Sequence, residues 1–327
     1  MKPGRVIAIS FVGAVAVAAA WFLFVRGGEP TYRGRTVTSW LGQVFDTRRN
    51  QAEALQALRQ LGAQAVPFEI SALTRTNSAL ERWYQSVYHS LPLRKYLPTP
   101  VAPETIRSAA ELALLNNQHV GEFIPDIVRL LQHEDPSVRA RASGILVNHI
   151  RARDTFCIPL LIEALNSPQP NVRRNLVLAL TKFGPAAKAA VPALEQGLKA
   201  DLAQIRIDCA RALGAIDANT ATVTKPVLKE AMGDGDPRIR HWASVYLSGI
   251  DAEDQEVMPV FIGSLTNSDP GIRMSAAYSL VRFGSKAKTA VPGLIVALTD
   301  PEASVRRAAR AALEKIDPES AAKAAIE

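Results

Sequence analysis

The stretch PVFIGSLTNSDPGIRMSAAYSL, residues 259–280, decides the fold. It predicts two short helices joined by a tight turn, because Pro259 suits a first helical turn and Asp269 can cap a second helix that begins at the following proline. An apolar face with spacings of four runs along that second helix: Ile272, Ala276 and Leu280. We therefore expect a helical hairpin with one buried face.

This hairpin recurs along the chain. Prolines that open a first helix are spaced by 34, 33, 34, 33 and 33 residues: Pro125, Pro159, Pro192, Pro226, Pro259 and Pro292. An arginine follows each proline by 14 residues: Arg139, Arg173, Arg206, Arg240, Arg273 and Arg306. A leucine follows each arginine by 7: Leu146, Leu180, Leu213, Leu247, Leu280 and Leu313. A hairpin of this kind hides its apolar face only against its neighbours, so the period predicts an α-solenoid.

The turn between the two helices carries the family resemblance. Tetratricopeptide and ankyrin repeats have similar periods, but their motifs do not occur in phase here. The turn instead reads Asp-Pro-x-Val/Ile-Arg at residues 135–139, 236–240 and 269–273, and it resembles the turn of HEAT repeats. The resemblance covers roughly residues 50–316. It implies an all-α fold, a right-handed α-solenoid of about eight HEAT-like helix pairs. The sequence itself, and not the resemblance, predicts a single N-terminal transmembrane helix before the solenoid.

In HEAT repeats the turn Asp and the helix Arg commonly form a ladder between neighbouring units. The resemblance therefore implies such a ladder here, with gaps where Gln169 and Leu202 replace the Asp. The repeated arginines also have the fork geometry that binds phosphates and carboxylates. Because they recur at one structural position, a structural role is the favoured interpretation.

The N-terminal segment, residues 1–25, predicts a signal anchor. Lys2 and Arg5 precede an uncharged run, residues 6–25, whose twenty residues span about 30 Å as a helix, the thickness of a hydrocarbon core. A cleavable signal peptide is the alternative, since small residues occur at 16–20. Positive charges nearly balance across the run. The short basic leader favours a single-pass protein of a bacterial inner membrane with the repeats outside the cytoplasm.

The remaining chain divides into three parts. Residues 26–49 predict a linker and a capping helix in which Trp40 and Val44 cover the open end of the stack. The repeats occupy 50–316, and an Ala-rich tail, 317–327, follows. Four glycines are expected to end helices: Gly62, Gly184, Gly214 and Gly284.

One part of the repeat region is irregular. Residues 66–73 match a first helix, and the aromatic stretch 79–91 is the expected partner. Four prolines then interrupt the pattern at 91–103, which indicates a surface loop or an eroded first helix, the latter being favoured.

The sequence offers no catalytic, cofactor or metal site, and we predict no enzyme activity. The five histidines form no pair at a metal-ligand spacing, and the common catalytic and phosphate-binding motifs do not occur. Cys157 and Cys209 are 52 residues apart and are expected to be buried packing residues. Some HEAT-like proteins are bilin lyases, but the repeat alone predicts no such activity. No small-molecule substrate is expected.

A nucleic-acid function is the alternative. The net charge of +7 and the pI near 9.5 suit an anionic partner, although Lys2 and Arg5 account for two of these charges. Some HEAT-like proteins are DNA glycosylases, which need clustered aromatics and an acid in a basic groove. Trp242, with Asp208 one repeat earlier, comes nearest to that requirement.

Protein binding is the favoured function. The surface of the second helices lines the concave side of typical HEAT stacks, and here it carries aromatic residues flanked by Arg and Lys, which is typical of binding hot spots. The predicted protein-binding surface consists of Arg141, Arg174, Lys182, Arg211, His241, Trp242, Tyr278 and Arg282. The sequence does not identify the protein partner.

Overall fold

The computed structural model describes residues 28–45, 51–90, 99–252 and 254–324. The chain forms two compact units, Met1–Ile150 and Arg151–Glu327. The predicted membrane anchor, residues 6–25, lies outside the described residues. None of the helices in the described ranges combines the length and the apolarity that a bilayer crossing needs.

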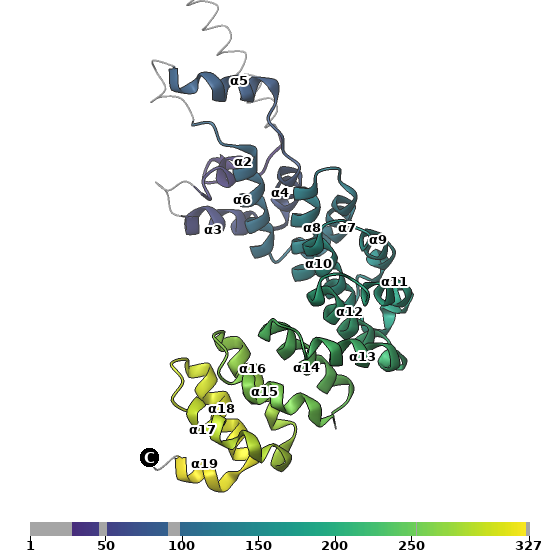
Figure 1. Cartoon of the computed structure of the whole chain (residues 1–327). Coiled ribbons are helices and arrows are strands. Elements are labelled where there is room, and N and C mark those ends of the chain that lie inside the picture. The colour runs from purple at the N-terminus through teal and green to yellow at the C-terminus, as the bar shows by residue number, and fades with distance from the viewer. Residues whose placement is uncertain (1–27, 46–50, 91–98, 253, 325–327) are drawn as a thin grey trace, which may run out of the picture. The chain divides into compact units, whose positions relative to one another are not determined.

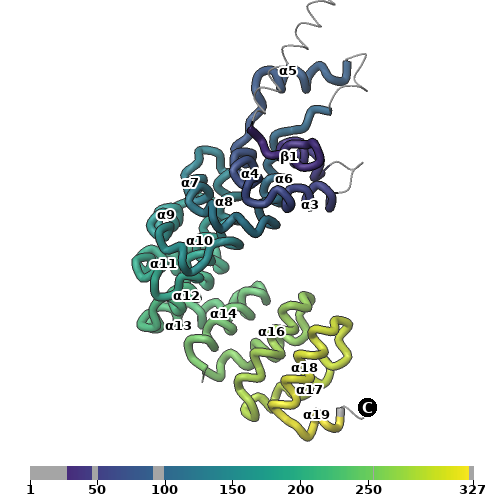
Figure 2. The backbone as a smooth tube through the Cα atoms, turned by 180° about the vertical axis from the view of Figure 1, so that it is seen from behind, coloured from purple at the N-terminus to yellow at the C-terminus, as the bar shows by residue number. Residues whose placement is uncertain are grey.

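In the described part of the first unit, a short antiparallel hairpin comes first and helices follow; Figure 2 labels its first strand. The strands pair Thr31 with Thr36 and Tyr32 with Arg35. In chain order the elements are β1 (Thr31–Tyr32), β2 (Arg35–Thr36), α2 (Val37–Leu41), α3 (Gln51–Leu61), α4 (Val66–Leu73), α5 (Ala79–Val87), α6 (Pro103–Asn116), α7 (Ile124–Arg129) and α8 (Pro136–His149).

Helix α2 matches the predicted capping helix. It contacts α3, α4 and α6, and the Trp40 and Val44 side chains are each 2% exposed. Thr36 caps the helix, since its hydroxyl accepts a hydrogen bond from the Ser39 N–H over 3.3 Å. The indole N–H of Trp40 donates to the Tyr32 carbonyl over 3.2 Å and so joins the helix to the hairpin.

The prediction that residues 79–91 partner the first helix at 66–73 is wrong. Helix α4 packs against α6, whereas α5 buries none of its residues and lies apart from the other helices of its unit in both views (Figures 1 and 2). The chain between α4 and α6 is therefore an excursion within one helix pair, and the structure describes it over residues 74–90 and 99–102. Its proline-rich part, residues 91–98, lies outside the described residues.

The second unit is a regular series of helix pairs (Figure 2). Short 3₁₀ segments precede most first helices, for example Gly184–Ala190 before α11. Its helices are α9 (Ile158–Ala164), α10 (Pro170–Thr181), α11 (Val191–Gly197), α12 (Ala203–Ile216), α13 (Ala221–Ala231), α14 (Pro237–Ile250), α15 (Met258–Ser264), α16 (Pro270–Val281), α17 (Val291–Ala297), α18 (Ala303–Ile316) and α19 (Pro318–Ala324). Helix α19 forms within the predicted tail and packs on α18.

The second helices α10, α12, α14, α16 and α18 each pack beside the next. Their repeated leucines are at most 1% exposed: Leu180, Leu213, Leu247, Leu280 and Leu313. The Asp269 carboxylate accepts a hydrogen bond from the Gly271 N–H over 2.8 Å, which confirms the predicted cap, and Asp236 caps α14 in the same way. The repeat therefore sets both the core and the helix starts.

Two local predictions are wrong. Gly62, Gly184 and Gly284 adopt positive φ where a helix ends, but Gly214 lies inside α12, where an added Cβ would approach Ile250 to 3.3 Å. Pro226 does not open its helix, because α13 already begins at Ala221. Pro226 and the residue four positions earlier are both exposed, so water can solvate the carbonyl that loses its N–H donor.

Candidate interaction surface on the second helices

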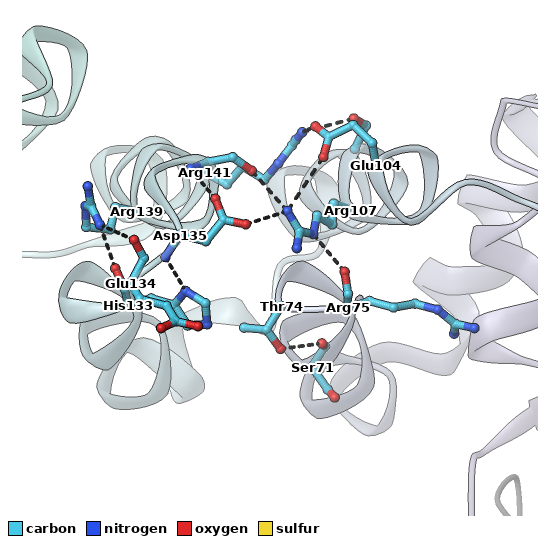
Figure 3. Close-up of polar contacts among 12 residues, drawn as sticks. Ser71, Thr74, Arg75, Glu104, Arg107, His133, Glu134, Asp135, Arg139 and Arg141 are labelled. Atoms are coloured by element: carbon cyan, nitrogen blue, oxygen red, sulfur yellow. Dashed lines mark hydrogen bonds and ion pairs between the residues drawn. The ribbon is translucent and has the colours of Figure 1, made fainter. Parts of the chain in front are cut away.

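The repeated arginines are structural. Each donates from Nη1 to the carbonyl six residues earlier, over 2.6–3.0 Å, and so closes the turn that precedes its own helix. Figure 3 shows Arg139 bound in this way to the carbonyls of His133 and Glu134, both over 2.8 Å. This contact supplies a partner for carbonyls in the turn between the two helices. It agrees with the favoured interpretation of the arginine period.

One contact of the expected Asp–Arg ladder forms in the first unit, and the second unit has a related pair whose aspartate lies two residues before the ladder position. Arg107 Nη1 lies 2.7 Å from Asp135 Oδ2, and its Nε donates to the Arg75 carbonyl over 2.9 Å (Figure 3). Arg273 binds Asp300 through two hydrogen bonds of 2.7 and 2.8 Å. At Leu202 the side chain offers no acceptor, as the sequence indicates. These pairs join neighbouring repeats. They also engage the guanidinium groups of Arg107 and Arg273, which are then not available to bind a ligand.

Arg141, the predicted surface residue of the first unit, is held within its own unit. Its guanidinium bonds Glu104, which lies beside it in Figure 3, and also Glu111. Its Nη2 lies 3.2 Å from the Ser108 hydroxyl. The side chain is 13% exposed. Because two carboxylates already neutralise it, Arg141 is a poor candidate for binding a partner's anion.

In the second unit a polar cluster joins α10, α12 and α14, and we call Arg174, Asp208, Arg211, Trp242 and Tyr246 the central cluster. The Asp208 carboxylate is 1% exposed. It accepts hydrogen bonds from Arg174 Nε over 3.1 Å, from Gln204 Nε2 over 3.1 Å and from the Tyr246 hydroxyl over 3.5 Å. Asp208 thus organises residues from three consecutive second helices.

The aromatic part of the central cluster is formed by α14. Trp242 and Tyr246 are one turn apart and stack with their ring centroids 6.1 Å apart. The Arg211 guanidinium lies over the Tyr246 ring, 5.3 Å from its centroid. Burial raises the pKa of Tyr246, so its hydroxyl remains protonated at neutral pH and can donate to Asp208.

The other predicted surface residues of this unit lie at helix ends or on α16. Lys182 and Arg282 occupy the C-cap positions of α10 and α16, and both are exposed. Tyr278 is 50% exposed. The second helices therefore also carry solvent-accessible basic groups and one exposed aromatic ring outside the central cluster.

The prediction that His241 is part of the binding surface is wrong. The structure buries its side chain completely, and a fully buried ring cannot contribute to an exposed surface. Its Nδ1 lies 3.2 Å from the Ser264 hydroxyl and its Nε2 lies 3.0 Å from the Ser275 hydroxyl, so it links α14 to α15 and α16. His241 directly follows the repeated arginine Arg240 on α14. The equivalent residue on α12 is Ile207, which is also fully buried. Burial lowers the pKa of His241 to about 4.

Tyr246 and Gln204 were missed by the sequence reasoning. Tyr246 lies four residues after Trp242, so an aromatic pair on one helical face was a usable signal. Gln204 gave no signal, because its role depends on a carboxylate that the structure buries. Asp208 was expected on the surface and is instead the buried centre of the cluster.

Charge is distributed unevenly between the two kinds of helix in the second unit. Helices α10, α12 and α14 each carry two arginines and α16 carries one, whereas Asp208 is the single carboxylate in these four described helices. First helices are less basic: α9 and α11 carry one glutamate each, Glu163 and Glu195, and α13 carries Glu230 with two lysines. The second-helix face is thus basic and partly aromatic.

Nucleophiles and metal ligands are not assembled in the described ranges. No group of three His, Cys, Asp or Glu side chains there is placed to hold a metal ion. Cys157 and Cys209 are buried free thiols, and burial raises their pKa values to about 11 and about 12. Both are therefore protonated at neutral pH, as expected for packing residues.

The HEAT-repeat profile matches four overlapping segments, residues 124–214, 158–248, 191–281 and 224–314. The chain belongs to the HEAT-repeat family. The matched segments lie within the part of the sequence where the period is unbroken, and together they cover more than half of the chain. Comparison with curated proteins gave no match.

Solved structures with similarity to the chain include two engineered proteins. One has 21% identity, a TM-score of 0.41 and covers 60% of this chain and 97% of its own. The other has 19% identity, a TM-score of 0.41 and covers 89% and 91%. The complex of CpcE and CpcF of phycocyanin lyase from Nostoc sp. PCC7120 has 16% identity and a TM-score of 0.45, and covers 86% and 96%.

Proposed function

We propose that this chain is a non-catalytic scaffold that binds another protein through the second-helix surface of its second unit. The single observation that carries the proposal is the central cluster with its exposed surroundings. Trp242, Tyr246 and Tyr278 supply aromatic area on α14 and α16, and Arg174, Lys182 and Arg282 add positive charge on α10 and α16. Rigid aromatic residues and arginines dominate the energetics of protein interfaces.

The nucleic-acid alternative is less consistent with this geometry. A glycosylase-like reaction needs a carboxylate that reaches the substrate, but Asp208 is 1% exposed and already accepts three hydrogen bonds. The repeated arginines are also engaged with turn carbonyls. This repeated row of arginines is therefore not available to follow a phosphate backbone, which requires many simultaneous contacts.

We also propose that residues 6–25 tether the scaffold to a membrane. The support is the uncharged apolar run itself, which has the length of a bilayer-spanning helix. A tether would raise the effective concentration of the scaffold near partners in the same membrane. Carbonate extraction of membranes tests this: the full chain should stay in the membrane pellet and residues 30–327 should be soluble, whereas extraction of both would contradict the tether.

Proximity labelling with the full-length chain tests protein binding. Trp242→Ala and Tyr278→Ala should each reduce labelling of the same partners, because each removes aromatic contact area. Trp83→Ala is a matched control, since Trp83 is 55% exposed but lies in the first unit on α5. Unchanged labelling with both second-unit variants would reject this surface. Salt-sensitive retention of residues 30–327 on duplex DNA would favour the nucleic-acid alternative.

A further inference from the structure

Arg211 differs from Arg174, Arg206 and Arg240 of the second helices in the surroundings of its guanidinium. It makes no hydrogen bond or ion pair with any residue that the structure describes, and its Nε is buried. Arg174, by comparison, binds Asp208, and Arg206 and Arg240 bind their turn carbonyls. A partly buried guanidinium with unused donors is costly unless an acceptor is supplied.

The surroundings hold this guanidinium in place. Among the described residues, the Arg211 guanidinium makes a cation–π contact with the Tyr246 ring, whose centroid lies 5.3 Å from Arg211 Cζ. Tyr246 is itself fixed by its hydroxyl, which lies 3.5 Å from Asp208, and by stacking on Trp242. Such a cation–π contact orients the planar group while leaving its edge donors available.

Asp208 does not neutralise Arg211, although it lies three residues earlier on the same helix. Its Oδ2 accepts from Arg174 and Gln204, and its Oδ1 faces the Tyr246 hydroxyl. The carboxylate instead adds a fixed negative charge beneath the cluster. That charge opposes a dianionic phosphate more strongly than a singly charged carboxylate.

We propose that Arg211 is the receptor for a carboxylate of the protein partner, from an Asp or Glu side chain, and that Trp242 packs against the residue that carries it. This inference rests on the proposed protein-binding function and specifies the chemistry of the partner. The guanidinium fork pairs with both oxygens of a carboxylate. The basic second-helix face around it favours an acidic segment of the partner over a neutral one.

Fluorescence anisotropy with the full chain in detergent tests the proposal, using labelled poly-L-glutamate as the probe at physiological salt. Arg211→Gln should weaken binding about tenfold, because a charge-assisted bidentate contact is lost. Arg211→Lys should also weaken it, since a lysine keeps the charge but not the fork. Arg238→Gln is the matched control: it removes one exposed arginine from α14 and should change the affinity by less than about twofold.

Two results would overturn the proposal. One is equal weakening by Arg211→Gln and Arg238→Gln, which would show a general effect of charge. The other is stronger competition by inorganic phosphate or by duplex DNA than by free glutamate polymer in the wild-type chain. Circular dichroism of each variant verifies that it is folded, and Arg211→Lys provides the test if Arg211→Gln does not fold.

The labelling experiment separates this inference from the proposed function. If Trp242→Ala and Tyr278→Ala reduce partner labelling but Arg211→Lys does not, protein binding stands and the carboxylate receptor is wrong. If none of the three changes labelling, the proposed function fails as well.

Discussion

A completely buried carboxylic acid in the first unit can be compared with a completely buried imidazole in the second. In the first unit Glu69 is fully buried, its Oε1 has no hydrogen-bond partner within the described part of the chain, and Asn117 Nδ2 lies 3.5 Å from Oε2. In the second unit the buried His241 has a hydroxyl at each ring nitrogen. Burial raises the pKa of Glu69 to about 8 and lowers that of His241 to about 4, so both groups are neutral at pH 7.

The two buried groups differ in how well their polar atoms are satisfied. The second unit, with unbroken repeats, satisfies its buried ring, whereas the first unit, interrupted by residues 74–102, leaves a carboxyl oxygen without a donor. The two groups should also respond to pH in opposite directions. An acid whose pKa is raised in the folded state makes the folded unit less stable as pH rises. A base whose pKa is lowered in the folded state makes the folded unit less stable as pH falls.

The largest expected effect is that of Glu69→Gln in the first unit. Between pH 4.5 and 8 the unfolded chain ionises Glu69 while the folded unit keeps it protonated, so folding is penalised by about 4 kcal/mol at pH 7.5. The glutamine variant should regain most of this lost free energy of unfolding at pH 7.5 and only a small part of it at pH 4.5. Native-state hydrogen exchange of amides in α4 and α6 measures it.

Glu122→Gln is the control for Glu69→Gln, because the Glu122 side chain is 67% exposed. It should change exchange in the first unit by less than about 0.5 kcal/mol. Equal protection of Glu69→Gln and wild type at pH 7.5 would show that Glu69 is ionised or solvated in the folded unit.

Gly197→Ala tests how tightly the regular unit is packed. A Cβ on Gly197 would overlap Cys209 Sγ, so the variant should lose about 2 kcal/mol, although alanine normally stabilises a helix relative to glycine. Adding Cys209→Ala should restore much of the loss because it removes the sulfur. Urea denaturation followed by circular dichroism measures both. Additive destabilisation in the double variant would contradict this packing.

Acidification from pH 7.5 to 5.5 should destabilise the second unit through His241. The unfolded imidazole, with an ordinary pKa of 6.5, gains a proton in this interval while the folded one does not, so the loss is about 1.4 kcal/mol. Hydrogen exchange in α14 and α16 should show the loss, and His241→Gln should abolish it. Over the same interval the first unit should gain stability, and parallel changes in both units would break the comparison.

Sequence reasoning predicted the features that repeat. The helix pairs, the capping role of Asp269 and the burial of Leu280 follow from local spacing, and each recurs often enough to be recognised. The partner of α4 could not be predicted, because 79–91 has the length and aromatic content of a helix and only tertiary packing excludes it. The burial of His241 and the match of Gly197 to Cys209 depend on contacts between helices, which a period does not encode.

The smallest expected effect is that of Trp83→Ala on α5. Trp83 is 55% exposed, and α5 has no buried residue, so removing the indole forfeits little packing. The free energy of unfolding should change by less than about 0.5 kcal/mol, as measured by urea denaturation. Leu73→Ala on α4 is the contrasting variant, because Leu73 is fully buried and its truncation should cost about 3 kcal/mol. A large loss from Trp83→Ala would mean that the excursion supports the core of the first unit, and the contrast between an interrupted and a regular unit would then no longer explain where stability resides.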